Sequence, residues 1–200
     1  MTRAKTLAIA AGSAAMVLIS GCEVPGTAAP EPSSSACTQL GGTVGSDGFC
    51  EVRDSTTTYT FTSRFPTDYP DQQPVADYLS QERADLVDFA SKSSAPARTH
   101  PFEIDIVGKA YQSGDGQTGT RSLVLDIGDD TGVHPVTLYK TFNYRLADHA
   151  PVTFQTLFKP GSDPLAMLNP IVRQQVLARD PSASVDLTAA SYEKFAITDD

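Results

Sequence analysis

The apolar residues of this chain follow two different periods from position 57 onward. Strand patterns occur at 57–65, 102–106, 121–127 and 136–144, where apolar side chains alternate with polar ones or form short runs between turns. Helical spacing occurs at 73–92 and 164–179, where apolar residues recur every three or four positions. Gly-rich turns at 114–116 and 128–132 separate the last three strands. We therefore predict that these three strands form an antiparallel meander.

Together these elements predict an α+β domain, in which two helices pack on an antiparallel sheet. We expect the second helix to be capped by Ser162 and to turn its apolar residues inward, namely Leu165, Leu168, Ile171, Val172 and Val176. A last strand is expected at Tyr192–Thr198, and Asp199 and Asp200 look like the start of a hairpin turn. An unpaired terminal strand is a liability, so we expect the chain to lack a final C-terminal strand.

The first 21 residues have the pattern of an export signal. Arg3 and Lys5 precede the uncharged stretch Leu7–Ile19, which is shorter than the roughly 20 apolar residues of a membrane span. The stretch ends in Ile-Ser-Gly followed by Cys22, an order that resembles the bacterial lipobox, in which the cysteine thiol takes a diacylglyceryl group before cleavage. We predict a lipoprotein signal peptide at 1–21 and lipidation of Cys22. The alternative is a plain secretory signal that is cleaved later, near Ala28.

Residues 22–36 are rich in Pro, Ser and Ala and contain almost no large apolar side chain. Such a segment buries too little surface to offset its ordering entropy, so we predict an extended tether. It would hold a folded part, 37–200, at the outer face of the cytoplasmic membrane. Two acyl chains, such as palmitate, anchor a protein stably, although release from the membrane stays an alternative.

Three cysteines remain to be assigned. If Cys22 is acylated, Cys37 and Cys50 form the available pair, and outside the cytoplasm such a pair is expected to be oxidised. The alternative is a zinc site, which needs further ligands, and His100, His134 and His149 lack zinc-type spacing. The acidic cluster around Asp129 also lacks the spacing of a calcium loop. We therefore expect neither a metal nor another cofactor.

The net charge of the chain limits the classes of molecule that it is expected to bind. The chain has 200 residues, a formal net charge of −9 and a pI of about 4.7. Cleavage after residue 21 removes two of the 15 basic residues and none of the 24 acidic ones, which leaves a net charge of −11. A protein this acidic repels phosphate backbones, so nucleic-acid binding is excluded as a main function. A basic protein or a neutral ligand remains compatible with this charge.

The sequence offers weak candidates for ester hydrolysis. The nucleophile-elbow pattern G-x-S-x-G is absent. Ser191 and Lys194 match S-x-x-K formally, but a polar turn explains them better. His134, in a turn before the strand at 136–144, is the best placed general base, although a histidine bonded to backbone at a strand end is the simpler interpretation. If the protein is an esterase, His134 and Ser191 are the candidate catalytic residues.

Binding candidates lie on the strand at 136–144. Strand alternation places Tyr139, Thr141 and Asn143 on one face, and Leu138, Lys140, Phe142 and Tyr144 on the other. An exposed row containing Tyr139 and Asn143 is suited to binding a glycan or a protein. The alternative is a sheet face covered by a helix, since strands are normally rich in aromatic residues.

Five stretches resemble the mycobacterial secreted immunogenic protein sixty-four family: CTQLGGTVGSDGFC, YPDQQPVADYLSQERADLVDF, HPVTLYKTFNY, TFQTLFKPGSDPLAMLNPIV and YEKFAITDD. The resemblance covers Cys37–Asp200. That family shares a domain with RsiV-type anti-sigma factors, which sense lysozyme. The resemblance implies an α+β fold with a β-grasp-like sheet, a Cys37–Cys50 disulfide and export to the cell envelope. One relative is described as a cell-wall carboxylesterase.

The chain departs from that family in two respects. Family members continue with a further strand past the position of Asp200, and many lack a lipobox. We expect no cytoplasmic sigma-binding region, so the signalling half of the anti-sigma role is not expected to carry over. We expect an exported, lipid-anchored, non-catalytic envelope protein that binds a lysozyme-like basic protein or cell-wall glycan. A carboxylesterase and a structural surface antigen are the alternatives.

Overall fold

A computed structural model describes residues 32–93, 100–132 and 134–199. The predicted signal peptide, the lipidation site Cys22 and residues 22–31 of the predicted tether lie outside these ranges. Residues 32–36 belong to a helix, α1 (Pro32–Gln39), so the chain is not extended up to residue 36 as predicted. Ala36 and Cys37 are buried, which explains the difference, because burial supplies the stabilisation that the composition of this segment seemed to lack.

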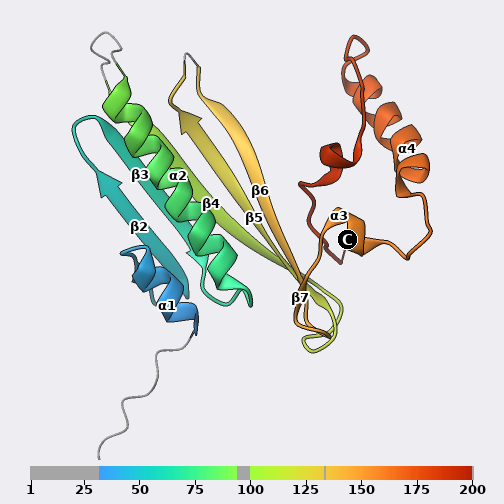
Figure 1. The fold of residues 1–200 in the computed structure, drawn as a ribbon, viewed down its shortest axis with the longest axis horizontal. Helices are drawn as coiled ribbons and strands as arrows, with labels where there is room; N and C mark the ends of the chain where they lie inside the picture. Colours follow the sequence, from blue (N-terminus) through green and yellow to red (C-terminus); the bar gives the residue numbers. More distant parts are fainter. Residues whose placement is uncertain (1–31, 94–99, 133, 200) are drawn as a thin grey trace, which may run out of the picture.

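The described residues form a seven-stranded sheet with the strands in sequence order (Figure 1). The strands are β1 (Thr43–Val44), β2 (Phe49–Ser55), β3 (Tyr59–Pro66), β4 (Phe102–Ser113), β5 (Thr120–Asp130), β6 (Val136–Arg145) and β7 (Ala150–Pro151). The pair β3–β4 is parallel, and the other neighbouring pairs are antiparallel. Parallel neighbours need a crossover, which is supplied by α2 (Gln72–Lys92). The predicted α+β class, with a mainly antiparallel sheet, is confirmed.

The main core lies between α2 and one face of the sheet. Alternate residues of the central strands point to this face, including Phe61, Phe65, Ile104, Ile106, Leu123 and Leu125. Val75, Leu79 and Leu86 of α2 pack against them and are almost fully buried. The predicted helix at 73–92 and the meander β4–β5–β6 are therefore confirmed, and the core follows from the two apolar periods.

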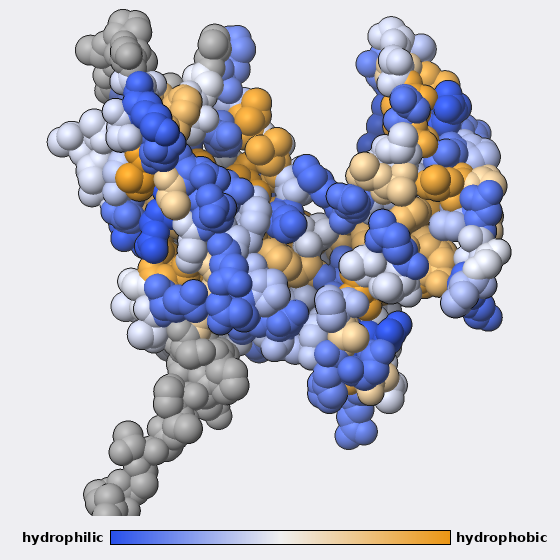
Figure 2. All heavy atoms as spheres, viewed as in Figure 1, coloured by the Kyte–Doolittle hydropathy of each residue, from blue (hydrophilic) through white to orange (hydrophobic). Residues whose placement is uncertain are grey.

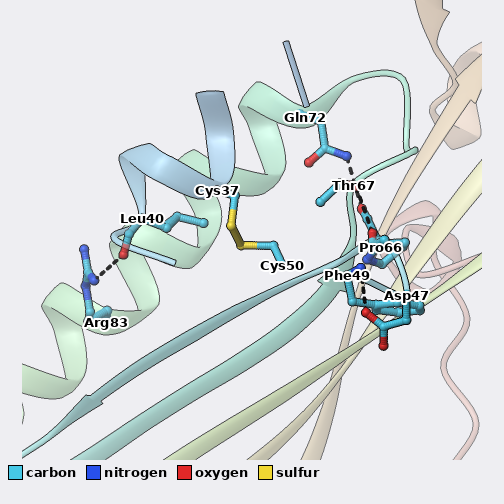
Figure 3. Close-up of a disulfide and its surroundings, with 10 residues drawn as sticks. Cys37, Leu40, Asp47, Phe49, Cys50, Pro66, Thr67, Gln72 and Arg83 are labelled. Carbon is cyan, nitrogen blue, oxygen red and sulfur yellow. Dashed lines mark hydrogen bonds between the residues drawn. A yellow bond between two sulfur atoms is a disulfide. The ribbon is translucent and has the colours of Figure 1, made fainter. Parts of the chain in front are cut away.

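A disulfide fastens α1 to the sheet (Figure 3). Cys37 and Cys50 are bonded, with their Cα atoms 5.7 Å apart, and both are buried. Close by, Arg83 of α2 donates to the Leu40 carbonyl at 3.0 Å, and the Gln72 amide donates to the Pro66 carbonyl at 3.2 Å. The expected Cys37–Cys50 pairing is confirmed. It links the N-terminal end of the described chain to the core.

The C-terminal third differs from its predicted packing. A helix forms as expected at α4 (Pro164–Arg179), but none of its described residues is buried, and it lies beside the sheet rather than on it (Figure 1). The prediction of inward-facing residues holds in part: Leu165, Leu168, Val172 and Val176 are half-buried, whereas Ile171 is 58% exposed. Helical spacing shows which residues share a face and not what covers that face. The helix start also differs: Asp163 accepts from the Ala166 N–H and caps α4, in place of Ser162.

The predicted last strand at Tyr192–Thr198 is not a strand. A 3-10 helix, η1 (Ala189–Tyr192), leads into an irregular segment, 193–199. Side chains of the sheet bind the backbone of this segment: Asn143 donates to the Phe195 carbonyl at 2.9 Å, and the Ile197 N–H donates to the Ser122 hydroxyl at 2.9 Å. The segment is therefore held across a face of the sheet instead of pairing along its edge.

Candidate functional site

No described helix covers the face of the sheet opposite α2 over much of β4, β5 and β6. The strand register places Val107, Asp126 and Tyr139 side by side on this face, and Lys109 beside Val124 in the next row. The residues that alternate with them along each strand point to the other side, where Phe142 contacts the ring of Tyr78 on α2. We call the surface formed by Asp105, Val107, Lys109, Tyr111, Val124, Asp126 and Tyr139 the open face.

The open face is hollowed and chemically mixed. Its lining encloses a cavity volume of about 610 Å³. Val107 is 45% exposed and Tyr139 is 48% exposed, which is high for large side chains on a sheet. The ammonium group of Lys109 lies 5.1 Å from the centre of the Tyr111 ring. Asp105 accepts a hydrogen bond from the Thr62 hydroxyl of β3. Apolar and aromatic surface next to fixed charges is typical of a binding surface.

The C-terminal segment closes one end of the open face. Asn143 is 6% exposed, and its side chain is occupied: the amide donates to Phe195, and its oxygen accepts from the Ser122 hydroxyl at 2.6 Å. Two residues earlier on the same face of β6, the Thr141 hydroxyl donates to the Glu193 carbonyl at 3.3 Å. The predicted face of Tyr139, Thr141 and Asn143 is therefore real, but Asn143 anchors the C-terminal segment and is not an exposed binding residue.

Of the two binding residues predicted from the sequence, Tyr139 and Asn143, only Tyr139 belongs to the open face. The residues beside it on β4 and β5, above all Val107, Lys109 and Val124, were not singled out from the sequence. Alternation along 102–106 and 121–127 marks which residues oppose the core, but only the strand register shows which of them are neighbours of Tyr139. That register depends on the lengths of two turns.

The structure does not bring the esterase candidates together. His134 is exposed in the β5–β6 turn. Ser191 belongs to η1, where its hydroxyl accepts from the Thr188 N–H at 3.1 Å and completes a capping box. Glu193, two residues after Ser191, accepts a hydrogen bond from Thr141 of β6. Thr141 is five residues from Val136, the first residue of β6, which is a distance of about 17 Å at 3.3 Å per residue. Ser191 is therefore far from the turn that carries His134. Figure 1 likewise shows η1 (dark red) and the β5–β6 turn on separate parts of the molecule.

A second hollow lies between α3 (Phe154–Leu157), α4 and the C-terminal segment. Its cavity volume is about 470 Å³, and both Ser191 and Lys194 line it. Phe154 also lines it: the ring stacks on Tyr192 with 5.2 Å between ring centres and meets Phe158 edge-on at 5.2 Å. The Ser191 hydroxyl stays committed to its cap, so its environment here does not show an activated nucleophile.

Within the described ranges, no three or more His, Cys, Asp or Glu side chains are grouped so that they would hold a metal ion. Among the same residues, no helix has the length and apolar character needed to cross a membrane.

Comparisons with known proteins give two kinds of relative. The chain is 42% identical over 194 residues to esterase Rv3036c of Mycobacterium tuberculosis, which covers 94% of this chain and 83% of that protein. It is 33% identical over 192 residues to immunogenic proteins MPT64 of M. tuberculosis and MPB64 of Mycobacterium bovis, which covers 92% of this chain and 81% of each of them. No family model matches the chain.

Two solved structures are similar in outline. One is a DUF3298 family protein from Pseudomonas aeruginosa, with a TM-score of 0.43 and 11% identity over 66% of each chain. The other is a DUF3298 member from Bacteroides fragilis, with a TM-score of 0.38 and 13% identity over 68% of this chain and 69% of that one.

Proposed function

Because the chain belongs to the mycobacterial MPT64 family of immunogenic proteins, we propose that it is an exported, lipid-anchored envelope protein that binds a partner through the open face. The observation that carries this proposal is the combination of exposure and position at Tyr139 and Val107. Both side chains stand on a sheet face that no described helix covers, next to Asp105, Asp126 and Lys109. Uncovered apolar surface with a charged border is typical of protein interfaces.

The charge of the protein favours a basic protein as the partner. Asp105 and Asp126 belong to the open face, and Glu103, Asp129 and Asp130 line a neighbouring hollow at the β5–β6 end of the sheet. With a net charge of −11 after cleavage, long-range attraction would speed encounter with a lysozyme-like protein. Cell-wall glycan is the second candidate ligand, since Tyr139 and Tyr111 offer rings on which a sugar can pack.

Retention on immobilised lysozyme tests this proposal. We expect the wild-type protein to bind at low ionic strength and to elute as salt rises, because exposed charges are screened. Tyr139→Ala and Val107→Ser should weaken binding about tenfold each, which corresponds to the loss of a moderate hot spot of about 1.4 kcal/mol. Val87→Ser is the matched control, since Val87 is exposed on α2, on the opposite side of the sheet.

Equal retention of all four proteins would show that charge alone explains the binding and would refute the open face as the site. No retention at low salt would refute a lysozyme-like partner. The same variants are then tested on purified cell-wall glycan, where loss of binding by Tyr139→Ala alone would identify the glycan as the ligand.

A carboxylesterase is the second candidate function, because the relative with 42% identity is named an esterase. The test is hydrolysis of short-chain nitrophenyl esters by the purified protein and by Ser191→Ala and His134→Ala. Loss of activity in either variant would establish the enzyme and place the reaction at that residue. Activity that survives in both would establish an esterase with other catalytic residues. Absence of hydrolysis in the wild type would leave the binding function.

The lipid anchor is tested separately from the binding function. Intact-mass analysis of the protein from its native host should show acyl mass on Cys22, and Cys22→Ser should abolish both the added mass and the membrane association. A mature chain that begins later and carries no acyl group would refute the anchor. Neither result changes what the open face binds, because the described fold begins at Pro32.

A further inference from the structure

Among the described residues, the outer edge of β6 is unpaired over most of its length. β7 pairs only with Tyr144 and Arg145 at one end of β6. The next bond on this side runs from the Val152 N–H to the Asn143 carbonyl, at 2.7 Å. From Val136 to Phe142, β6 pairs with β5 on its inner side, and in the part of the chain that the structure describes no segment pairs with its outer side.

The bond at Asn143 fixes which backbone groups point outward. In an antiparallel strand the N–H and C=O of one residue point to the same side, and the side alternates from residue to residue. Because the Asn143 carbonyl points outward, the N–H and C=O groups of Thr141, Tyr139 and Thr137 do so as well. These groups form a ladder ready to pair with a further strand.

The two edges of this sheet differ in how well they are protected against pairing with another chain. At the other edge, β1 covers β2 only at Cys50 and Glu51, and the remainder carries the charged side chains Arg53 and Asp54. Charges on an edge strand discourage pairing with another chain. The β6 edge carries a single charge, Lys140, among exposed apolar residues: Val136 is 49% exposed and Leu138 is 44% exposed. Figure 2 shows hydrophobic side chains gathered at this edge, near the β5–β6 turn.

We propose that the β6 edge binds an extended segment of a partner protein by strand addition. The segment would alternate polar residues with apolar ones and carry one carboxylate. Its backbone would pair with Thr137, Tyr139 and Thr141, and its apolar side chains would lie next to Leu138 and Phe142. This inference goes beyond the open face, because recognition at the edge uses backbone groups of β6.

Lys140 decides the charge of the partner segment. It is the only charged residue from Val136 to Tyr144, and its ammonium group lies over the rings of Tyr78 and Phe142, at 5.4 and 5.5 Å. Lys140 falls at a non-hydrogen-bonded position toward the added strand, where facing side chains approach most closely. A carboxylate is therefore favoured opposite it. A second copy of this chain fits worse, because it would bring a second Lys140 to the same ribbon, and each copy carries a net charge of −11 after cleavage.

The test uses a fluorescent, acetylated peptide, Val-Thr-Glu-Thr-Val-Thr, in which the glutamate faces Lys140. We expect saturable binding, measured by fluorescence anisotropy, and binding about fivefold weaker when lysine replaces the glutamate. Tyr139→Pro removes one outward N–H without removing a bond to β5, and should weaken binding at least tenfold. Tyr139→Thr keeps the N–H and should bind the peptide within about threefold of wild type.

Modified peptides keep the test valid even if Tyr139→Pro does not fold. N-methylation of the threonines blocks the N–H groups that face β6 and should abolish binding, whereas N-methylation of the glutamate and the second valine should not. Equal binding of both methylated peptides, or unchanged binding by a folded Tyr139→Pro protein, would refute strand addition. So would a β6-mediated dimer that the peptide does not dissociate. Tyr139→Thr separates the two sites, since it should weaken lysozyme binding about tenfold and keep peptide binding.

Discussion

Removal of the Cys37–Cys50 disulfide should lower the free energy of unfolding by about 3 kcal/mol. The bonded cysteines are 13 positions apart, and the loop-closure entropy for a loop of this length corresponds to about 3 kcal/mol at 25 °C. Both residues are almost fully buried, at 1% and 0% exposure, so the double variant Cys37→Ala/Cys50→Ala also loses packing. The loss should therefore reach the full chain-entropy value.

Guanidinium unfolding of the wild type and the double variant measures this difference. The slope of free energy against denaturant should also rise, because the uncrosslinked chain exposes more surface when it unfolds. Wild-type protein unfolded in the presence of reductant is the control, since it loses the bond but keeps both sulfur atoms. A loss below about 1 kcal/mol in both samples would contradict the reasoning, because it would mean that the denatured chain holds α1 near the sheet without the bond.

Three further predictions concern the core and the C-terminal segment. Gly108→Ala should destabilise the fold by about 1–3 kcal/mol in chemical unfolding, because the new Cβ would lie 2.8 Å from the Phe65 Cβ; an unchanged midpoint would show that β3 and β4 separate easily. Asn143→Ala should speed amide exchange at Ile197, because Asn143 positions the Ser122 hydroxyl that accepts from it; unaltered exchange would mean that other contacts hold the segment. Stability should fall as pH rises above about 10, because burial raises the pKa of Tyr69 and of Tyr78, with Asp71 and Glu82 adding to the respective effects. The protonated phenols stabilise the native state fully below the unfolded pKa of about 10, so equal urea midpoints at pH 8 and 11 would refute this.

Local patterns in the sequence predicted where the helices and strands lie better than they predicted which elements pack or pair with one another. Helical spacing located α2 and α4, and strand alternation assigned Leu138 and Tyr139 to opposite faces of β6. The parallel pairing of β3 with β4 was not predicted, because it depends on where the chain returns after α2. The exposed position of α4 was missed for the same reason.

The candidate site shows the same limit. Tyr139 was found because one strand carries its own alternation, whereas Val107 and Lys109 join it only through the register of β4 and β5. Asn143 was assigned to the correct face, but its side chain is buried there instead of exposed. Its partners Phe195 and Ser122 lie 52 and 21 positions away, which strand spacing does not encode.

The central proposal is that the open face is the surface that binds the partner. Titration of isotopically labelled protein with lysozyme, followed by amide NMR spectra, tests it most directly. The account predicts that perturbed amides cluster at Val107, Lys109, Val124 and Tyr139, with Leu79 and Leu86 of α2 unaffected. Perturbations confined to the hollow around Phe154, Ser191 and Lys194, or none at saturating lysozyme, would contradict it.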